Sequence, residues 1–246
     1  MLKIENLSVK FDQRHILKDL SLEIKEGNII GLIGQNGCGK TTLLNAVCGF
    51  VNPDGGSILY KDNDITGLAP YKRANQGIGR SFQHAGVFKE MSVEENIILA
   101  VERAKKYPWW WKFSKNWRNK ADKIVNETLT EIDLLGHKKS LASVLSGGQL
   151  RLLELSRLKI SGGSLLLIDE PTAGVSPTMK KILAKTIRNL STDKSRSIVI
   201  VEHDLKFLFE IVDYVIVLVE GQIYIQGKPK DIINDKKLQE VYFGTK

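Results

Sequence analysis

The pattern of apolar and polar positions changes along the first part of the chain. Near the start, apolar and polar residues alternate over two stretches separated by a polar turn, which predicts two strands with one buried face each. A continuous apolar run follows at residues 29–33 and predicts a fully buried strand, and a helix is expected from Lys40. Residues 52–56 (Asn-Pro-Asp-Gly-Gly) interrupt the chain before another short strand at residues 57–60.

The middle of the chain has a helical pattern. Between about Ser92 and Leu145 no strand pattern occurs. Ser92-Val93-Glu94-Glu95 forms a capping-box start, and a second amphipathic run covers residues 114–135. We therefore expect a helical insertion between two regions that contain strands.

After Ser146, apolar strands and amphipathic helices alternate again. The pattern predicts strands at residues 165–168 and 197–201 and helices at residues 177–190 and from Asp204. Such strand–helix repetition is typical of a largely parallel sheet with helices on its faces. The end of the chain predicts a hairpin turn at Glu220-Gly221 and a terminal helix at residues 229–242.

Composition narrows the classes of protein. The 246 residues include 36 Lys and Arg against 28 Asp and Glu, a formal charge of +8 that by itself suggests nucleic acid or a membrane surface. A hydrophobic content of 42% is enough for a substantial core and excludes general disorder. The longest apolar runs, residues 198–201 and 214–219, are far below the roughly 20 residues of a helical membrane span. Neither a signal peptide nor a disulfide framework is expected, which favours a reduced, cytoplasmic location.

A phosphate-binding loop is the most specific motif. Residues 34–41 (Gly-Gln-Asn-Gly-Cys-Gly-Lys-Thr) follow an apolar strand and precede a helix, the context that this motif requires. The glycines allow backbone N–H groups to surround an anion, and the helix N-terminus adds partial positive charge. Lys40 would contact the β- and γ-phosphates, and Thr41 would offer its hydroxyl to Mg²⁺.

Two carboxylates follow a later strand. Asp169 and Glu170 end the apolar run at residues 165–168. Asp169 would hold Mg²⁺, and Glu170 would orient and deprotonate an attacking water. An acidic residue directly after the metal-binding Asp favours hydrolysis over a switch or a kinase.

A second candidate phosphate-binding surface, residues 145–149, precedes the helical stretch predicted at residues 150–160. Ser146, Gly147, Gly148 and Gln149 place a hydroxyl and two glycine N–H groups at a helix N-terminus. Two such surfaces in one chain suggest a nucleotide that is enclosed from two sides.

Together these motifs resemble the nucleotide-binding subunits of ATP-binding cassette (ABC) transporters, over essentially the whole chain and in the family's order. Residues 34–41 resemble Walker A, residues 145–149 the signature, and residues 165–170 Walker B. Gln83 falls at the Q-loop glutamine, His203 at the switch histidine, and Phe11 at the aromatic residue that stacks on adenine.

The resemblance implies roles for individual residues. Gln83, Glu170 and His203 would be catalytic, and Thr41, Gln83 and Asp169 would contact the metal. The residues expected to bind ATP are Phe11, Gly34, Gln35, Asn36, Gly37, Cys38, Gly39, Lys40, Thr41 and Thr42. In this family two cassettes pair head to tail, so Ser146, Gly147, Gly148 and Gln149 would act on the ATP of the other subunit.

The resemblance also implies an architecture and partners. We expect an α/β P-loop NTPase cassette with a mainly parallel core sheet, an antiparallel β subdomain and a helical subdomain. The whole chain, residues 1–246, would be one domain, with residues 1–91 and 146–246 as the core and residues 92–145 as the helical subdomain. ATP and Mg²⁺ are the expected cofactors. A second cassette, membrane permease subunits and an extracytoplasmic solute-binding protein are the expected partners, at the cytoplasmic face of the membrane.

A narrower resemblance concerns the transported solute. Residues 77–84, 87–96 and 171–177 resemble ATPases of importers for branched-chain amino acids and of their relatives for urea and short amides. Export cassettes of lipopolysaccharide assembly share the Ala-Gly-Val-x-Pro loop and remain an alternative. A non-transport cassette acting on nucleic acid is less favoured, because the chain contains one set of motifs and no coiled-coil or zinc insertion.

Two further expectations concern reactive or exposed side chains. Cys38 lies inside the phosphate-binding loop, where backbone N–H groups and Lys40 should favour its thiolate, whereas Cys48 is expected in the core. Trp109, Trp110 and Trp111 are consecutive, so they cannot all face inward from one helix. At least one is expected to be exposed and to contact the permease or lipid.

Overall fold

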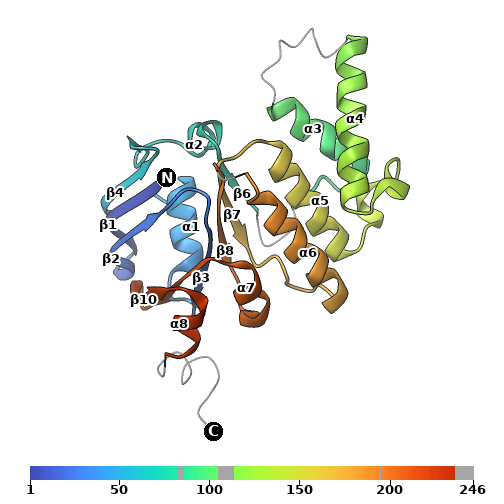
Figure 1. Cartoon of the computed structure of the whole chain (residues 1–246). Coiled ribbons are helices and arrows are strands. Elements are labelled where there is room, and N and C mark those ends of the chain that lie inside the picture. The colour runs from blue at the N-terminus through green and yellow to red at the C-terminus, as the bar shows by residue number, and fades with distance from the viewer. Residues whose placement is uncertain (82–85, 105–113, 194, 236–246) are drawn as a thin grey trace. The chain divides into compact units, whose positions relative to one another are not determined.

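The computed structural model describes residues 1–81, 86–104, 114–193 and 195–235 (Figure 1). The described residues form two compact units. The first contains Met1–Arg80, Ser164–Glu170 and the described residues from Ser191 onward. The second contains the described residues between Ser81 and Gly163 together with Pro171–Leu190. The expected helical subdomain, residues 92–145, falls inside the second unit, and its boundaries as a subdomain of a single cassette remain a prediction.

A six-stranded sheet organises the first unit. Across the sheet its strands are β10 (Gln222–Gly227), β9 (Tyr214–Val219), β3 (Ile29–Gly34), β8 (Ser197–Val201), β7 (Leu165–Asp169) and β6 (Ile78–Arg80). The five strands from β9 to β6 are parallel, and β10 pairs antiparallel with β9. Every residue of β3, β7 and β8 is buried, as their continuous apolar runs predict. The predicted mainly parallel sheet and the hairpin at Glu220-Gly221 are confirmed.

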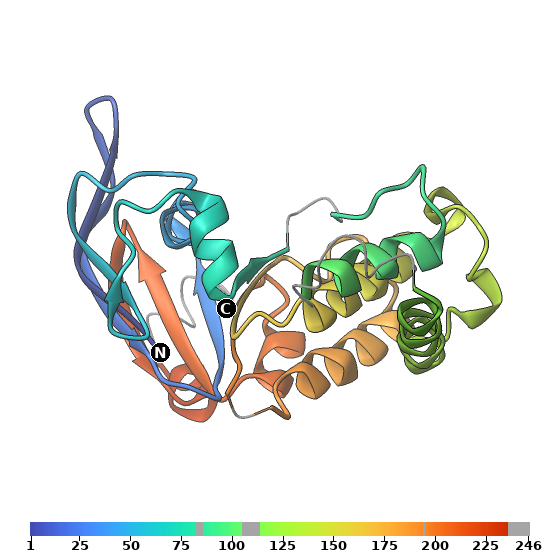
Figure 2. The same cartoon turned by 90° about the horizontal axis from the view of Figure 1, so that it is seen from above.

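A second, antiparallel sheet belongs to the same unit. Its order is β2 (Arg14–Ile24), β1 (Leu2–Phe11), β4 (Gly55–Tyr60) and β5 (Asn63–Asp64). Figure 2 shows the hairpin of β1 and β2 in blue at one edge of this unit. Alternating burial along these strands confirms the sequence pattern, since one face packs on the core and the other meets solvent.

Helix α1 (Lys40–Cys48) begins at the predicted residue and lies between the two sheets (Figure 1). Its apolar face packs with residues of both sheets in one continuous core, which also includes Cys48, as expected. The other helices of this unit are α2 (Pro70–Gln76), α7 (Leu205–Ile211) and α8 (Pro229–Ile233). The expected terminal helix at residues 229–242 is shorter in the structure, because α8 ends at Ile233 with Asn234 as its C-cap; residues 236–242 lie outside the described residues.

The second unit is helical in its described residues. It consists of α3 (Val93–Ala104), α4 (Lys115–Glu131), α5 (Gly147–Ile160) and α6 (Pro177–Leu190), with 3₁₀ turns at Leu135–His137 and Ala142–Val144. Helix α5 packs against both α3 and α6, and the three helices lie side by side in Figure 2. No helix in the described part of the chain is both long enough and apolar enough to cross a membrane.

Two sequence predictions about this unit can be compared with its side chains. The capping box before α3 is confirmed, because Ser92 N donates to Glu95 Oε2 at 2.7 Å and Glu95 N donates to Ser92 Oγ at 3.2 Å. Trp117 on α4 is buried. Trp109, Trp110 and Trp111 lie outside the described residues, so their exposure stays a prediction.

Arg73 of α2 links the C-terminus of α1 to the loop before α2. Its guanidinium donates to four backbone carbonyls, those of Ala46 at 2.6 Å, Val47 at 3.1 Å, Thr66 at 2.7 Å and Leu68 at 2.8 Å. The side chain is fully buried, and burial lowers its pKa. The carbonyls at a helix C-terminus have no partners within the helix. The guanidinium therefore supplies donors there, in addition to the N–H of Gly49, which donates to Ala46 O at 3.1 Å.

We expect Arg73→Met to lower the free energy of unfolding by about 3 kcal/mol, because several buried carbonyls lose their donor. Arg73→Lys should recover little of this loss, since one ammonium group cannot reproduce the planar, multiple donation of a guanidinium. Urea unfolding followed by circular dichroism measures both, with the exposed Arg118→Met as the matched control. A lysine variant as stable as the wild type would contradict this role of Arg73.

Candidate active site

The phosphate-binding loop joins β3 to α1 at the carboxyl edge of the parallel sheet. Gly37 has a φ of 79° and Gly39, the residue before α1, a φ of 109°, in the left-handed region that side chains disfavour. Gly39 has a second constraint, because a Cβ there would lie 2.8 Å from Leu17 Cδ2. The loop therefore needs glycine at this point to turn its N–H groups around an anion at the start of α1.

Lys40 and Cys38 lie inside this loop. Lys40 is 6% exposed, and its ammonium group donates to the carbonyls of Gly34 at 2.7 Å and Gln35 at 2.9 Å. Cys38 is also 6% exposed, with its sulfur 4.0 Å from Lys40 Nζ. Burial raises the pKa of the Cys38 thiol, and the nearby charge of Lys40 offsets only part of this effect. The expectation of a favoured thiolate was therefore wrong, because the cost of desolvating the anion exceeds its attraction to Lys40.

Asp169 ends β7 and is 2% exposed. Arg80, at the end of the neighbouring strand β6, places Nη2 3.4 Å from Asp169 Oδ2 and donates through Nη1 to Asn45 Oδ1. Burial raises the pKa of Asp169, whereas the charges of Arg80 and Lys40 lower it. Asn45 lies four residues after Thr41 on α1, so Arg80 connects Asp169 to the helix face that carries Thr41.

Glu170 and His203 form a pair beside Asp169. Glu170 Oε1 lies 3.2 Å from His203 Nε2. Glu170 has a φ of 45°, an uncommon conformation for a residue with a side chain, and its N–H donates to Val201 O at 2.9 Å. Since Val201 ends the adjacent strand β8, this hydrogen bond fixes the turn that directs Glu170 toward His203.

The backbone around His203 is also held. The carboxylate of Glu202, which is buried, accepts from the N–H groups of His203 at 2.8 Å and Asp204 at 3.2 Å. Asp204 in turn caps α7 by accepting from Phe207 N at 3.1 Å. The histidine is thus positioned between the end of a buried strand and the start of a capped helix.

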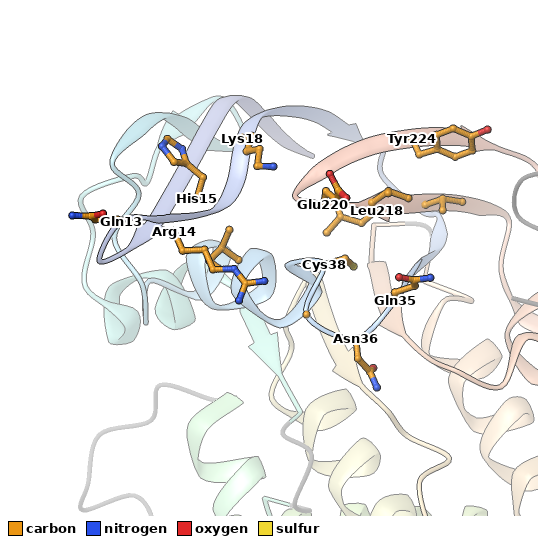
Figure 3. A pocket seen from close by; sticks show the side chains of 14 residues that line it. Gln13, Arg14, His15, Lys18, Gln35, Asn36, Cys38, Leu218, Glu220 and Tyr224 are labelled. Atoms are coloured by element: carbon orange, nitrogen blue, oxygen red, sulfur yellow. The ribbon is translucent and has the colours of Figure 1, made fainter. Parts of the chain in front are cut away.

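A pocket of about 890 Å³ lies beside the phosphate-binding loop (Figure 3). Its walls come from the β1–β2 turn together with the start of β2, from residues 35–38, and from the hairpin of β9 and β10. Figure 3 shows Arg14 extending from the first of these walls toward the loop, with Cys38 close to Leu218. Phe11 pairs with Arg14 across the β1–β2 turn and is 49% exposed, but it is not one of the lining residues.

The signature residues begin α5 in the second unit. Ser146 and Gln149 form a capping box in which Ser146 N donates to Gln149 Oε1 at 2.9 Å and Gln149 N donates to Ser146 Oγ at 3.4 Å. Gly148 allows α6 to approach closely, because a Cβ there would overlap Met179 Cγ. Glycine is therefore required at position 148 for the packing of α5 against α6, in addition to any role of its N–H group.

The structure brings together part of the predicted site. Within the first unit, Lys40, Asp169, Glu170 and His203 occupy one edge of the sheet, at the ends of β3, β7 and β8. Thr41 is exposed and Thr42 half-buried in the first turn of α1. Gln83 lies outside the described residues.

Two residues of the site, Arg80 and Glu202, were not identified from the sequence. Each contacts a predicted site residue through an arrangement that a linear pattern does not show. Arg80 becomes relevant only once β6 is known to lie next to β7, and Glu202 only once its carboxylate is seen to turn back to its own backbone. The useful signal would have been a charged residue at the end of an otherwise apolar strand, as at Arg80 and Glu202.

A glycine-rich loop between a buried parallel strand and a helix, with an acidic pair and a histidine at the ends of neighbouring strands, defines the class of P-loop nucleotide triphosphatases. Comparison with known proteins narrows the class. Residues 17–173 match the family model described as ABC transporter. The chain belongs to the ABC transporter family, as one of its ATPase subunits.

Three relatives illustrate the similarity. The probable branched-chain amino acid transport ATP-binding protein LivG of Archaeoglobus fulgidus is 34% identical over 100% of this chain and 96% of its own length. The lipopolysaccharide export system ATP-binding protein LptB of Haemophilus influenzae is 31% identical over 99% of this chain and 97% of its own length. A solved ATP-binding cassette of an ABC transporter in its ADP conformation is 30% identical, has a TM-score of 0.83, and aligns over 100% of this chain and 99% of that one.

We expect Gly148→Ala to destabilise the protein by about 2 kcal/mol, because the new methyl group overlaps Met179 and forces α5 and α6 apart. Thermal unfolding measures this loss. Met179→Ala in the same chain should restore most of it by removing the overlapping atoms. Gly147→Ala is the matched control, since a Cβ there meets nothing within 4 Å. Equal losses at positions 147 and 148 would argue against the packing role.

We expect Cys38 to react slowly with N-ethylmaleimide near neutral pH, because its pKa is raised and only the thiolate is nucleophilic. The rate should rise about tenfold per pH unit below the pKa. Bound ATP should slow it further by covering the loop. Mass spectrometry of the labelled peptide follows the rate, and Cys38→Ala confirms the site. Fast, pH-independent labelling would show that Cys38 is already a thiolate near neutral pH and would contradict the raised pKa.

Proposed function

We propose that this ATPase subunit works as one half of a cassette dimer and powers the import of branched-chain amino acids or related small polar solutes. The observation that carries the hydrolytic part is the placement of Glu170 beside His203, next to the buried Asp169 and Lys40, at one sheet edge. The similarity to LivG, which is named for branched-chain amino acid transport and covers the whole chain, supports the solute class.

The residues of the loop suit the phosphates of ATP. The N–H groups at the start of α1 and the ammonium of Lys40 favour the β- and γ-phosphate oxygens. For this to happen, Lys40 exchanges its bonds to the Gly34 and Gln35 carbonyls for bonds to phosphate oxygen. The two carbonyls belong to residues of the same loop, so Lys40 would leave contacts within the loop to bind phosphate.

Mg²⁺ fits the oxygen ligands that the chain offers. The hydroxyl of Thr41 and the carboxylate of Asp169 are hard ligands of the kind that Mg²⁺ prefers, and Gln83 would add a carbonyl oxygen. When bound, Mg²⁺ neutralises charge on the β- and γ-phosphates. Arg80 holds Asp169 on the side of Asn45, so the carboxylate is already oriented.

Glu170 is the proposed general base. It accepts a proton from water while the water oxygen forms a bond to the γ-phosphorus and the bond to the ADP oxygen breaks, which releases ADP and phosphate. His203, 3.2 Å from Glu170, orients the carboxylate and contacts the γ-phosphate. Glu202 holds the histidine backbone in place during this step.

A second cassette and membrane subunits complete the proposed assembly. Ser146, Gly147, Gly148 and Gln149 would cover the ATP bound to the other subunit, and Phe11 would stack on its own adenine. The assembly would lie at the cytoplasmic face of the membrane, with permease subunits and an extracytoplasmic binding protein. Lipopolysaccharide export is the second candidate, favoured by the 31% identity to LptB over 99% of the chain.

The test uses the complex purified with its membrane subunits and reconstituted in vesicles. We expect ATP-dependent uptake of leucine or a related solute and an ATPase rate that falls about a thousandfold in Glu170→Gln, because the amide cannot accept the proton. The variant should still bind ATP and should accumulate as an ATP-bound dimer in size-exclusion chromatography.

Glu127→Gln, on the exposed face of α4, is the matched control and should leave turnover unchanged. Rapid hydrolysis by Glu170→Gln would show that Glu170 is not the general base. Hydrolysis stimulated by lipopolysaccharide, with no uptake of amino acids or amides, would favour the export candidate instead.

A further inference from the structure

The segment from Gly86 to Phe88 is held by side chains at both of its ends. Gly86 N donates to Glu154 Oε1 at 2.8 Å, and Arg157 Nη1 donates to the Gly86 carbonyl. Phe88 N donates to Asn96 Oδ1 at 3.0 Å, and Asn96 Nδ2 donates to the Phe88 carbonyl at 2.9 Å. We call these contacts the Gly86 clamp, formed by Glu154 and Arg157 of α5 and by Asn96 of α3.

Two side chains of the Gly86 clamp are buried. Glu154 is 4% exposed and Asn96 is fully buried, so each needs its hydrogen bonds to offset the loss of water. The second oxygen of Glu154 pairs with Arg151 at 2.9 Å, which fixes the direction of the first toward Gly86. Arg157 also lies over the Phe88 ring at 5.0 Å, and burial lowers its pKa.

The clamp connects two sequence motifs that have separate proposed roles. Gly86 is three residues after Gln83, the proposed sensor of the attacking water and the permease. Glu154 and Arg157 lie eight and eleven residues after Ser146 on the helix whose N-terminus would cover the other subunit's ATP. The clamp thus joins the backbone that follows Gln83 to the helix that begins with the signature residues.

We propose that Glu154 and Arg157 are positioning residues that fix the chain downstream of Gln83 to the signature helix, so that the two motifs move together. This inference rests on the proposed function for the roles of Gln83 and Ser146. Glu154 acts through the backbone of Gly86 and does not touch nucleotide. A purely structural role would stabilise the helical unit without any link to Gln83.

The experiment compares two substitutions of Glu154 that differ in one acceptor. Glu154→Gln keeps an oxygen that can accept from Gly86 N–H, whereas Glu154→Met keeps the length of the side chain and removes the acceptor. Both variants are also made in combination with Arg151→Met. If Glu154→Met alone fails to fold, the double variant avoids a buried arginine charge without its partner.

We expect Glu154→Met to lower the kcat for ATP about tenfold with an unchanged KM, since the phosphate-binding loop is untouched, and Glu154→Gln to stay within about twofold of the wild type. In a double-mutant cycle, adding Glu154→Met to the Gln83→Ala variant should lower its kcat no further, because both changes remove the effect of a correctly positioned Gln83. Amide hydrogen exchange at Gly86 should accelerate in Glu154→Met and not in Glu154→Gln.

The matched control is Glu131→Met, which removes the exposed ion pair between Glu131 of α4 and Lys159 of α5 and leaves Gly86 untouched. It should change neither kcat nor exchange at Gly86. The proposal is overturned if Glu154→Met and Glu154→Gln have equal kcat values at equal stability, or if the effects of Glu154→Met and Gln83→Ala multiply.

The outcomes also separate this inference from the proposed function. Hydrogen exchange at Gly86 reports on the clamp without any turnover. A wild-type chain that binds no ATP would remove the proposed function while the exchange result still stood. The opposite result is also possible: the wild-type chain hydrolyses ATP through Glu170, but the effects of Glu154→Met and Gln83→Ala on kcat multiply. That result would leave the proposed function intact and would exclude the positioning role of the clamp.

Discussion

The parallel pairing of β8 with both β3 and β7 is the constraint on which the site depends. Strands that run in the same direction end at the same edge of a sheet, so the segments that follow them meet there. This pairing brings the phosphate-binding loop, the Asp169-Glu170 pair and His203 together from segments that are more than thirty residues apart in the chain. The apolar sequences that place β3, β7 and β8 in the core therefore also bring the polar groups of the site together.

The backbone around these groups is held by side chains that do no chemistry themselves. Glu202 accepts from two N–H groups beside His203, and Val201 O accepts from Glu170 N. The hydrogen bond from Glu170 N to Val201 O supports the uncommon φ of Glu170, because strained conformations persist only where the surroundings determine them. The site thus combines a rigid sheet edge with a few local hydrogen bonds that set side-chain direction.

Sequence patterns predicted the buried strands, the start of α1, the capping box of α3 and the residues of the loop, because each depends on local periodicity or on a contiguous motif. They did not predict Arg80 beside Asp169, since β6 and β7 are far apart in the chain and their pairing is a property of the whole sheet. The expected preference of Cys38 for the thiolate was wrong for a related reason. Its neighbours in sequence favour the thiolate, but burial contributed by distant strands outweighs them.

Arg73 differs from Arg80 and Arg151 in its partners, and this has a consequence for solution conditions. The hydrogen bonds described for its guanidinium go to neutral carbonyls, whereas Arg80 and Arg151 contact carboxylates. Salt screens the attraction between exposed charges strongly but acts far less on buried groups, and the fully buried Arg73 donates to neutral carbonyls. The link between α1 and α2, and with it the anchoring of the phosphate-binding helix at its far end, should therefore hold across the wide range of salt concentrations that a cell can experience under osmotic stress.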